Sequence, residues 1–185
     1  MSVILLGGSP SSHSSSSRLL QHVGDKLAVH GWRTERIEVR ELPGAALLSM
    51  DAQDPELARA LALVASADAL VVATPIYKAA YTGMLKLFLD LLPQDGLRGK
   101  AVLPLATGGS QSHMLALDYA LRPVLASMAA RAILPSIYAT SDQIAWDNEH
   151  GTRLAPAIAE RVAQGVDQLS AELQARLQFA RAAAA

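Results

Sequence analysis

The stretch Asp68–Pro75 reads DALVVATP, and the five residues that follow its aspartate are all apolar. A short continuous apolar run is typical of a strand that is buried on both faces, as in the middle of a parallel sheet. Ser2–Gly7 and Lys100–Ala106 have the same character; Gly7-Gly8 closes the first, and Thr107-Gly108-Gly109 ends the second. We therefore expect three buried strands that form the centre of one sheet.

Stretches with helical spacing alternate with these strands. A helix is expected from about Leu19 to His30, where Gly31 ends it, because Leu19, Leu20, Val23 and Leu27 recur at helical intervals. The other expected helices are Pro55–Ser66, Thr82–Leu92, His113–Met128 and Pro156–Phe179. Two more strands are expected at Arg33–Val39 and Ile133–Thr140, and loops at Pro43–Gln53 and around Trp146. This alternation predicts an α/β fold, and five strands favour the flavodoxin-like parallel sheet of order 2-1-3-4-5 with helices on both faces.

Length and composition exclude several other classes of protein. A chain of 185 residues, 51% apolar, predicts one domain over residues 1–180, with residues 181–185 as a frayed tail. The net charge of −1 predicts no nucleic-acid partner and gives no acidic field of the kind that steers small electron carriers. The chain has no Cys and no short His pair, so neither a thiol nucleophile nor a metal site is expected. No signal peptide or membrane span is recognisable, and we expect a cytoplasmic protein.

In this fold a ligand binds beyond the carboxyl ends of the strands, where three turns converge. The first turn, from Ser9 to Ser17, contains seven serines and leads directly into a helix. Hydroxyls and free backbone N–H groups at a helix N-terminus suit a phosphate, so one interpretation of this turn is a phosphate cradle. The alternative interpretation is a flexible serine-rich loop with an N-cap. Arg18 is the one cation close by in sequence. The position of the serine-rich turn, directly after the first strand, favours the phosphate cradle.

The second and third turns have residues that suit a flat ring. Tyr77 and Tyr81 follow Pro75, and aromatic side chains at a crevice pack on planar ligands, although an ordinary loop is the alternative. Gly108 and Gly109 follow Thr107 and permit close approach of the backbone, although a plain strand-to-helix turn is the alternative. The motifs G-x-G-x-x-G and G-x-x-x-x-G-K-[ST] are absent. The three turns together favour a flat phosphorylated ligand, and FMN fits best.

Two helices have unusual sequences. Pro123 lies inside His113–Met128, and a proline there cannot donate to the carbonyl of Tyr119, so we expect a simple kink or a π-bulge around Tyr119. The helix Met84–Leu92 is apolar nearly all round. Such a helix is buried on more than one side, which predicts either a subunit interface or deep packing within the chain, and we favour the interface.

These segments make the chain similar to the NADPH-dependent FMN reductases, above all to the reductase component of alkanesulfonate monooxygenase systems. The resemblance runs from residue 1 to about 140 and is strongest at Val3–Ser9, Val72–Tyr81, Leu103–Gly109 and Asp118–Leu125. It implies FMN and NADPH as cofactors, a partner monooxygenase that uses reduced FMN, and a homo-oligomer, a dimer of dimers, with Tyr119 in a π-helix at its interface. It also implies two sets of flavin-binding residues. Those for the phosphate are Ser9, Ser14, Ser15, Ser16 and Ser17, and those that line the ring are Pro75, Ile76, Tyr77, Lys78, Thr107, Gly108, Gly109 and Ser110.

One departure from the family pattern bears on the mode of flavin use. The family usually has an arginine where this chain has Ser11. Loss of that cation weakens the expected hold on the phosphate, so that flavin behaves more as a substrate than as a fixed group.

The function that we predict is hydride transfer from NADPH to FMN, without a catalytic acid or base, because the stacked rings need only proximity. The reduced FMN then leaves for a monooxygenase, which the resemblance places in sulfonate sulfur assimilation. The alternatives are a quinone or azo reductase with tightly bound FMN, a flavodoxin-type electron carrier, and a phosphate-binding module without flavin.

Overall fold

The computed structural model describes residues 1–147 and 151–183. Its main sheet consists of parallel strands in the order β2-β1-β3-β4-β5, with β6 also paired to β4. The strands are β1 (Ser2–Gly7), β2 (Arg33–Glu38), β3 (Ala69–Pro75), β4 (Ala101–Gly108), β5 (Ala132–Ile133) and β6 (Ile137–Thr140). The flavodoxin-like fold and the order of its strands are confirmed.

The predicted fifth strand, Ile133–Thr140, is wrong as one continuous element. β5 pairs with the start of β4 and β6 pairs with its end, and the chain leaves the ladder between them. Pro135 lies in the gap and has no N–H to donate to a neighbouring strand. The proline therefore divides the edge of the sheet into two short strands.

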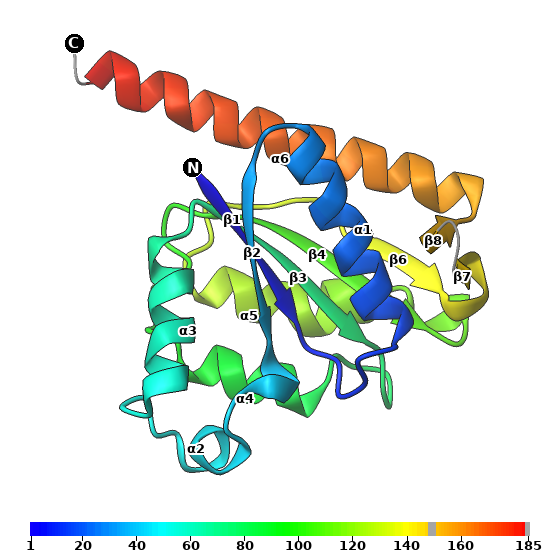
Figure 1. Ribbon diagram of the computed structural model, residues 1–185, viewed down its shortest axis with the longest axis horizontal. Helices are drawn as coiled ribbons and strands as arrows, with labels where there is room; N and C mark the ends of the chain where they lie inside the picture. The colour runs from blue at the N-terminus through cyan, green and yellow to red at the C-terminus, as the bar shows by residue number, and fades with distance from the viewer. Residues whose placement is uncertain (148–150, 184–185) are drawn as a thin grey trace.

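Helices cover both faces of the sheet (Figure 1). α1 (Ser15–Val29) and α6 (Pro156–Ala183) pack on one face, and α2 (Gly44–Ser49), α3 (Pro55–Ser66), α4 (Gly83–Leu91) and α5 (Arg122–Ser127) pack on the other. Successive residues of β1 point to opposite faces, so Val3 and Leu5 belong to one core cluster and Ile4 and Leu6 to the other. The continuous apolar runs of the sequence follow from this double burial.

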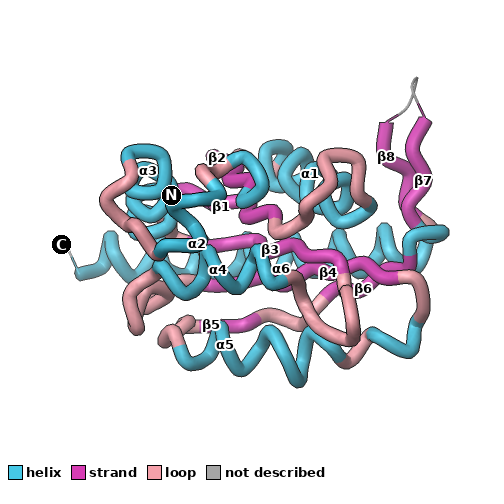
Figure 2. The backbone as a smooth tube through the Cα atoms, turned by 90° about the horizontal axis from the view of Figure 1, so that it is seen from below, coloured by secondary structure: helices cyan, strands magenta, loops and turns pink. Residues whose placement is uncertain are grey.

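Two stretches that were expected to be loops contain regular structure. The stretch 43–53 includes the one-and-a-half-turn helix α2, which ends where Met50 adopts a left-handed conformation (φ 57°). The stretch around Trp146 forms an antiparallel hairpin of β7 (Ile144–Asp147) and β8 (Gly151–Leu154), which stands out from the end of the sheet in Figure 2. These elements are only four to six residues long, too short to show a period in the sequence.

The predicted helix His113–Met128 is interrupted, as Pro123 requires. A 3₁₀ turn at Gln111–His113 is followed by a π-helix at Leu117–Leu121, and α5 begins only at Arg122. Tyr119 lies at the centre of the π-helix, four residues before the proline. The missing N–H of Pro123 leaves the Tyr119 carbonyl without its α-helical donor, and the wider turn accommodates the mismatch.

α6 continues past the predicted end at Phe179 to Ala183, and the last two residues of the predicted tail lie outside the described residues. None of the helices in residues 1–147 and 151–183 is both long and apolar enough to cross a bilayer. The apolar side chains of α4 are directed largely inward, since Leu85, Phe88 and Leu89 are buried in the core of the chain. Met84, Leu87 and Leu91 remain half-buried.

Candidate functional site

A cavity of about 340 Å³ lies at the carboxyl edge of the sheet, where the loops after β1, β3 and β4 meet. This volume is within the range of small-molecule sites, roughly 300–1,000 Å³. The structure therefore brings the three turns of the sequence prediction together, and eight of the predicted residues line one space: Ser14, Ser15, Pro75, Ile76, Tyr77, Thr107, Gly108 and Gly109.

The N-terminus of α1 borders one side of this cavity. Ser14 is the N-cap, and its Oγ accepts a hydrogen bond from the Ser17 N–H at 3.1 Å. Within the described residues, the N–H groups of Ser15 and Ser16 have no acceptor, as is usual for the first turn of a helix. The first turn also has no acidic residue. This end of the cavity is thus suited to an anion.

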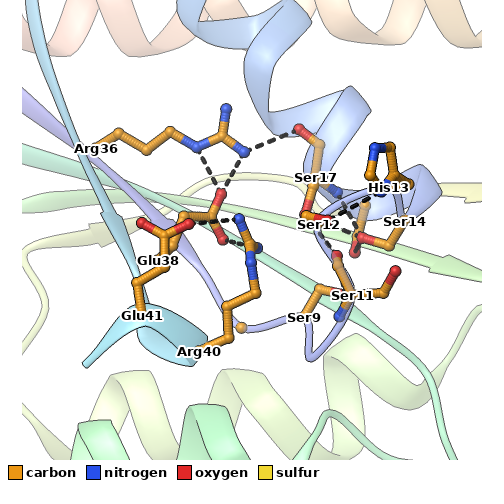
Figure 3. Close-up of polar contacts among 12 residues, drawn as sticks. Ser9, Ser11, Ser12, His13, Ser14, Ser17, Arg36, Glu38, Arg40 and Glu41 are labelled. Atoms are coloured by element: carbon orange, nitrogen blue, oxygen red, sulfur yellow. Dashed lines mark hydrogen bonds and ion pairs between the residues drawn. The ribbon is translucent and has the colours of Figure 1, made fainter. Parts of the chain in front are cut away.

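The other predicted serines of this turn shape the loop and do not line the cavity. Ser9 is buried, and its Oγ accepts from the Ser11 N–H at 3.2 Å and donates to the Ser11 carbonyl at 3.1 Å. Ser16 and Ser17 are also buried, and both hydroxyls are hydrogen-bonded to that of Ser14. Figure 3 shows Ser9 beside Ser11 and Ser14 beside Ser17.

The loop after β3 carries an aromatic side chain at the mouth of the cavity. The Tyr77 side chain is largely exposed, at 53%. It begins a tight turn in which the Tyr77 N–H donates to the Ala80 carbonyl at 2.9 Å. Lys78 and Ala79 between them have φ values of 49° and 63°, a left-handed conformation that residues with a side chain seldom adopt. Lys78 therefore forms the turn and is not part of the lining.

A residue of the π-helix holds this strained turn. The Tyr119 hydroxyl donates a hydrogen bond to the Ala79 carbonyl at 2.7 Å. The ring of Tyr119 remains 59% exposed. The π-helix is thus linked directly to the loop that borders the cavity.

The two glycines of the third loop serve different purposes. A Cβ on Gly108 would lie 2.3 Å from the Tyr138 hydroxyl, so Gly108 is required for packing against that ring. A Cβ on Gly109 would meet no atom within 4 Å, so Gly109 faces open space. Ser110 does not line the cavity: its Oγ accepts from the Ser112 N–H at 3.2 Å, and its carbonyl accepts from Tyr138. Burial raises the pKa of the Tyr138 phenol, which keeps this donor protonated.

Thr82 fastens the first loop to the second. Its buried hydroxyl donates to the Gly8 carbonyl at 2.6 Å and accepts from the Leu85 N–H at 3.2 Å, as the N-cap of α4. Its own N–H donates to the Thr74 hydroxyl at 3.1 Å. The Thr82 side chain, which the sequence analysis did not single out, therefore links the two loops.

Three further lining residues were missed by the sequence prediction: Ser11, His13 and Ser141. Ser11 and His13 belong to the serine-rich turn. Ser141 follows β6, and the rule that parallel strands end at one edge would have indicated it. No Lys, Arg, Asp or Glu lines this cavity among the described residues. The helix N-terminus at one end and the Tyr77 and glycine loops at the other suit a phosphate joined to a planar ring, as in FMN.

A charged cluster adjoins the phosphate side of the site (Figure 3). Glu38, at the end of β2, is buried and lies between Arg36 and Arg40. Arg36 donates through Nε to Glu38 at 2.6 Å and through Nη2 to the Ser17 carbonyl at 3.3 Å. The cluster thus connects β2 to the first turn of α1.

Comparison with known proteins gives this geometry its context. The family model described as NADPH-dependent FMN reductase matches residues 1–145. A protein named FMN reductase (NADPH) from Pseudomonas putida is 41% identical, over 95% of this chain and 90% of its own length. One of the same name from Escherichia coli is 42% identical, over 88% and 84%. The apo crystal structure of an NADH:FMN oxidoreductase (EMOB) superposes with a TM-score of 0.84 at 40% identity, over 94% of this chain and 89% of that one. On this agreement of sequence, fold and cavity, the chain belongs to the NADPH-dependent FMN reductase family and is an enzyme of that type.

Proposed function

We propose that this chain is a cytoplasmic NAD(P)H:FMN oxidoreductase that reduces FMN as a dissociable substrate and passes it to an FMNH₂-dependent monooxygenase. Residues 1–180 form the single catalytic domain in this proposal. The observation that carries it is the convergence of three loops on one cavity, with a helix N-terminus at one end and an exposed tyrosine at the other.

Different residues would bind the phosphate and the ring of FMN. The N–H groups of Ser15 and Ser16 and the hydroxyl of Ser15 would bind the phosphate, while the Ser14 hydroxyl caps the helix and donates to the Ser17 hydroxyl. Residues 75–77 and 107–109 would line the ring. When bound, FMN supplies a ring that accepts a hydride from the nicotinamide, so the chain need only position the two rings and exclude water.

The lining supports a flavin that leaves after each turnover. Among the described residues no Lys or Arg lines the cavity, and Ser11 stands where the family usually has an arginine. The phosphate would then be held by neutral donors and the helix dipole, without an ion pair. Hydrogen bonds to a charged group contribute about 1.5–3 kcal/mol each, and the absence of a paired cation lowers affinity accordingly.

The resemblance to the reductases of alkanesulfonate monooxygenase systems supports a monooxygenase as the consumer of reduced FMN, with sulfonate sulfur as the destination. A homo-oligomer, a dimer of dimers, is part of the same proposal. Exposed apolar and aromatic side chains support it, since Tyr77, Met114, Leu115 and Tyr119 are each 45–59% exposed. Light scattering on the purified protein tests the oligomer.

The decisive experiment follows NADPH oxidation by flavin-stripped protein during titration with FMN. We expect many turnovers and saturation only when FMN exceeds the enzyme. Saturation at one FMN per site, with turnover that depends on an added quinone or azo dye, would assign the protein to the reductases with tightly bound flavin. FMN binding without NADPH oxidation would indicate an electron carrier, and absence of FMN binding would overturn the proposal.

A further inference from the structure

A second cavity, of about 490 Å³, lies beside the first turn of α1. Three elements that are distant in sequence form it: α1 with the loop before it, β2, and the β7–β8 hairpin. Its lining consists of Ser12, His13, Ser17, Arg18, Gln21, Arg36, Trp146 and Thr152. His13 also lines the candidate flavin cavity, so the two spaces adjoin at this residue.

The charge of this second cavity is positive. Two guanidinium groups line it, from Arg18 and Arg36, and among the described residues no carboxylate does. Arg36 forms an ion pair with the buried Glu38, which does not line the cavity (Figure 3). Arg18 has no ion pair within the described parts of the chain, and its guanidinium lies over the Trp146 ring, 5.4 Å from the centroid.

This contact with Trp146 fixes the orientation of the Arg18 guanidinium. An arginine stacked on an indole face is held by a cation–π interaction and keeps its N–H donors free at its edge. A planar guanidinium with free donors binds a phosphate by paired, charge-assisted hydrogen bonds. The cavity therefore presents a pre-oriented phosphate receptor, with Trp146 as the residue that positions it.

We infer that this second cavity binds the adenosine 2′-phosphate end of NADPH, with Arg18 as the residue that selects NADPH over NADH. The inference rests on the proposed function, because it takes FMN to occupy the neighbouring cavity. FMN has one phosphate, for which the N-terminus of α1 already provides donors, whereas NADPH brings a further phosphate that NADH lacks. Arginines near a dinucleotide site commonly accommodate that 2′-phosphate. The relatives named above differ in this respect, since two are named for NADPH and one for NADH.

The test uses Arg18→Ala, with Arg33→Ala as the matched control. Arg33 lies on β2 and does not line either cavity, its side chain is 75% exposed, and it pairs with Glu35, so its removal changes the net charge equally. Binding of 2′,5′-ADP and of 5′-AMP to the flavin-free protein is measured by calorimetry. KM is measured for NADPH and for NADH, and FMN affinity by fluorescence.

We expect Arg18→Ala to weaken 2′,5′-ADP binding roughly tenfold or more, to leave 5′-AMP binding the same as in the wild type, and to raise the ratio of the NADPH KM to the NADH KM by a similar factor. Arg18→Lys keeps the charge without the planar guanidinium, so its affinity for 2′,5′-ADP is expected to lie between those of the wild type and Arg18→Ala. Equal changes for both coenzymes, or an equal effect of Arg33→Ala, would overturn the inference. A matching loss of FMN affinity would instead assign Arg18 to the flavin phosphate. Failure of the proposed function is a separate outcome, since the wild type would then oxidise neither coenzyme in the presence of FMN.

Discussion

The hydroxyl of Tyr119 in the π-helix donates a 2.7 Å hydrogen bond to the carbonyl of Ala79, forty residues earlier in the chain. Ala79 and Lys78 adopt left-handed backbone conformations, which cost of order 1–3 kcal/mol each and persist only where neighbouring groups hold them. The bulge that Pro123 causes therefore has a structural consequence, because it presents Tyr119 to the loop that begins with Tyr77.

Tyr119→Phe is expected to loosen this loop and weaken FMN binding. The variant removes one hydrogen bond of about 0.5–1.5 kcal/mol and keeps the ring, so the dissociation constant for FMN should rise a few-fold. Fluorescence titration measures the change, and light scattering shows whether the assembly is retained. Tyr119→Ala removes the ring as well, and a greater effect on assembly than that of Tyr119→Phe would separate the two contributions. Unchanged FMN affinity in both variants would show that the bond does not support the site.

Thr82→Val is expected to destabilise the protein and raise the KM for FMN together. Valine has the shape of threonine but neither donates to the Gly8 carbonyl nor caps Leu85, and both groups are buried. Leaving such groups unpaired costs roughly 1–3 kcal/mol of unfolding free energy. Urea denaturation measures that loss. Thr82→Ser keeps the hydroxyl and should retain most of the stability, so equal losses in the two variants would mean that packing of the methyl group, and not the hydroxyl, matters.

The centre of the fold was predictable because its strands are buried on both faces. β1, β3 and β4 have continuous apolar sequences, and the π-helix follows from one proline in a helical stretch. The hairpin β7–β8 was not predictable, since its strands are short and pair only with each other. The break between β5 and β6 had a signal, Pro135, which demotes the strand that contains it.

The candidate site was predictable as a place but not residue by residue. Because ligands bind beyond the carboxyl ends of parallel strands, the sequence locates the three turns. It does not tell which serine of a run faces the cavity. That choice depends on hydrogen bonds within the loop, such as those that turn Ser9 toward Ser11 and leave Ser15 at the lining. The partnership of Arg18 with Trp146 joins residues far apart in the chain and leaves no pattern in the sequence.

Stability is expected to fall on mild acidification because of His22. Burial, followed by the charge of Lys26, lowers the pKa of His22, with an opposing effect of Asp25. The unfolded chain then binds a proton at His22 near its ordinary pKa of about 6.5, where the folded chain does not, so stability is lost as the pH falls through that value. His22→Gln removes this titration. The difference in unfolding free energy between variant and wild type, measured at several pH values by urea denaturation, should shift in favour of the variant as the pH falls, and a constant difference would contradict the assignment.

Gly108 and Gly109 offer a matched pair that separates packing from ligand binding. In Gly108→Ala the new Cβ would lie 2.3 Å from the Tyr138 hydroxyl, and the crowding is expected to cost about 1–3 kcal/mol of unfolding free energy. In Gly109→Ala the Cβ meets nothing within 4 Å, so stability should stay near that of the wild type while the KM for FMN rises, because Gly109 lines the cavity and an added methyl group enlarges the backbone wall there. Adding Tyr138→Phe to Gly108→Ala removes the crowded oxygen and should restore part of the stability, although the carbonyl of Ser110 loses its donor. If both alanine variants lost stability equally, or if the phenylalanine gave no rescue, the packing of Gly108 against Tyr138 would not be the reason for this glycine.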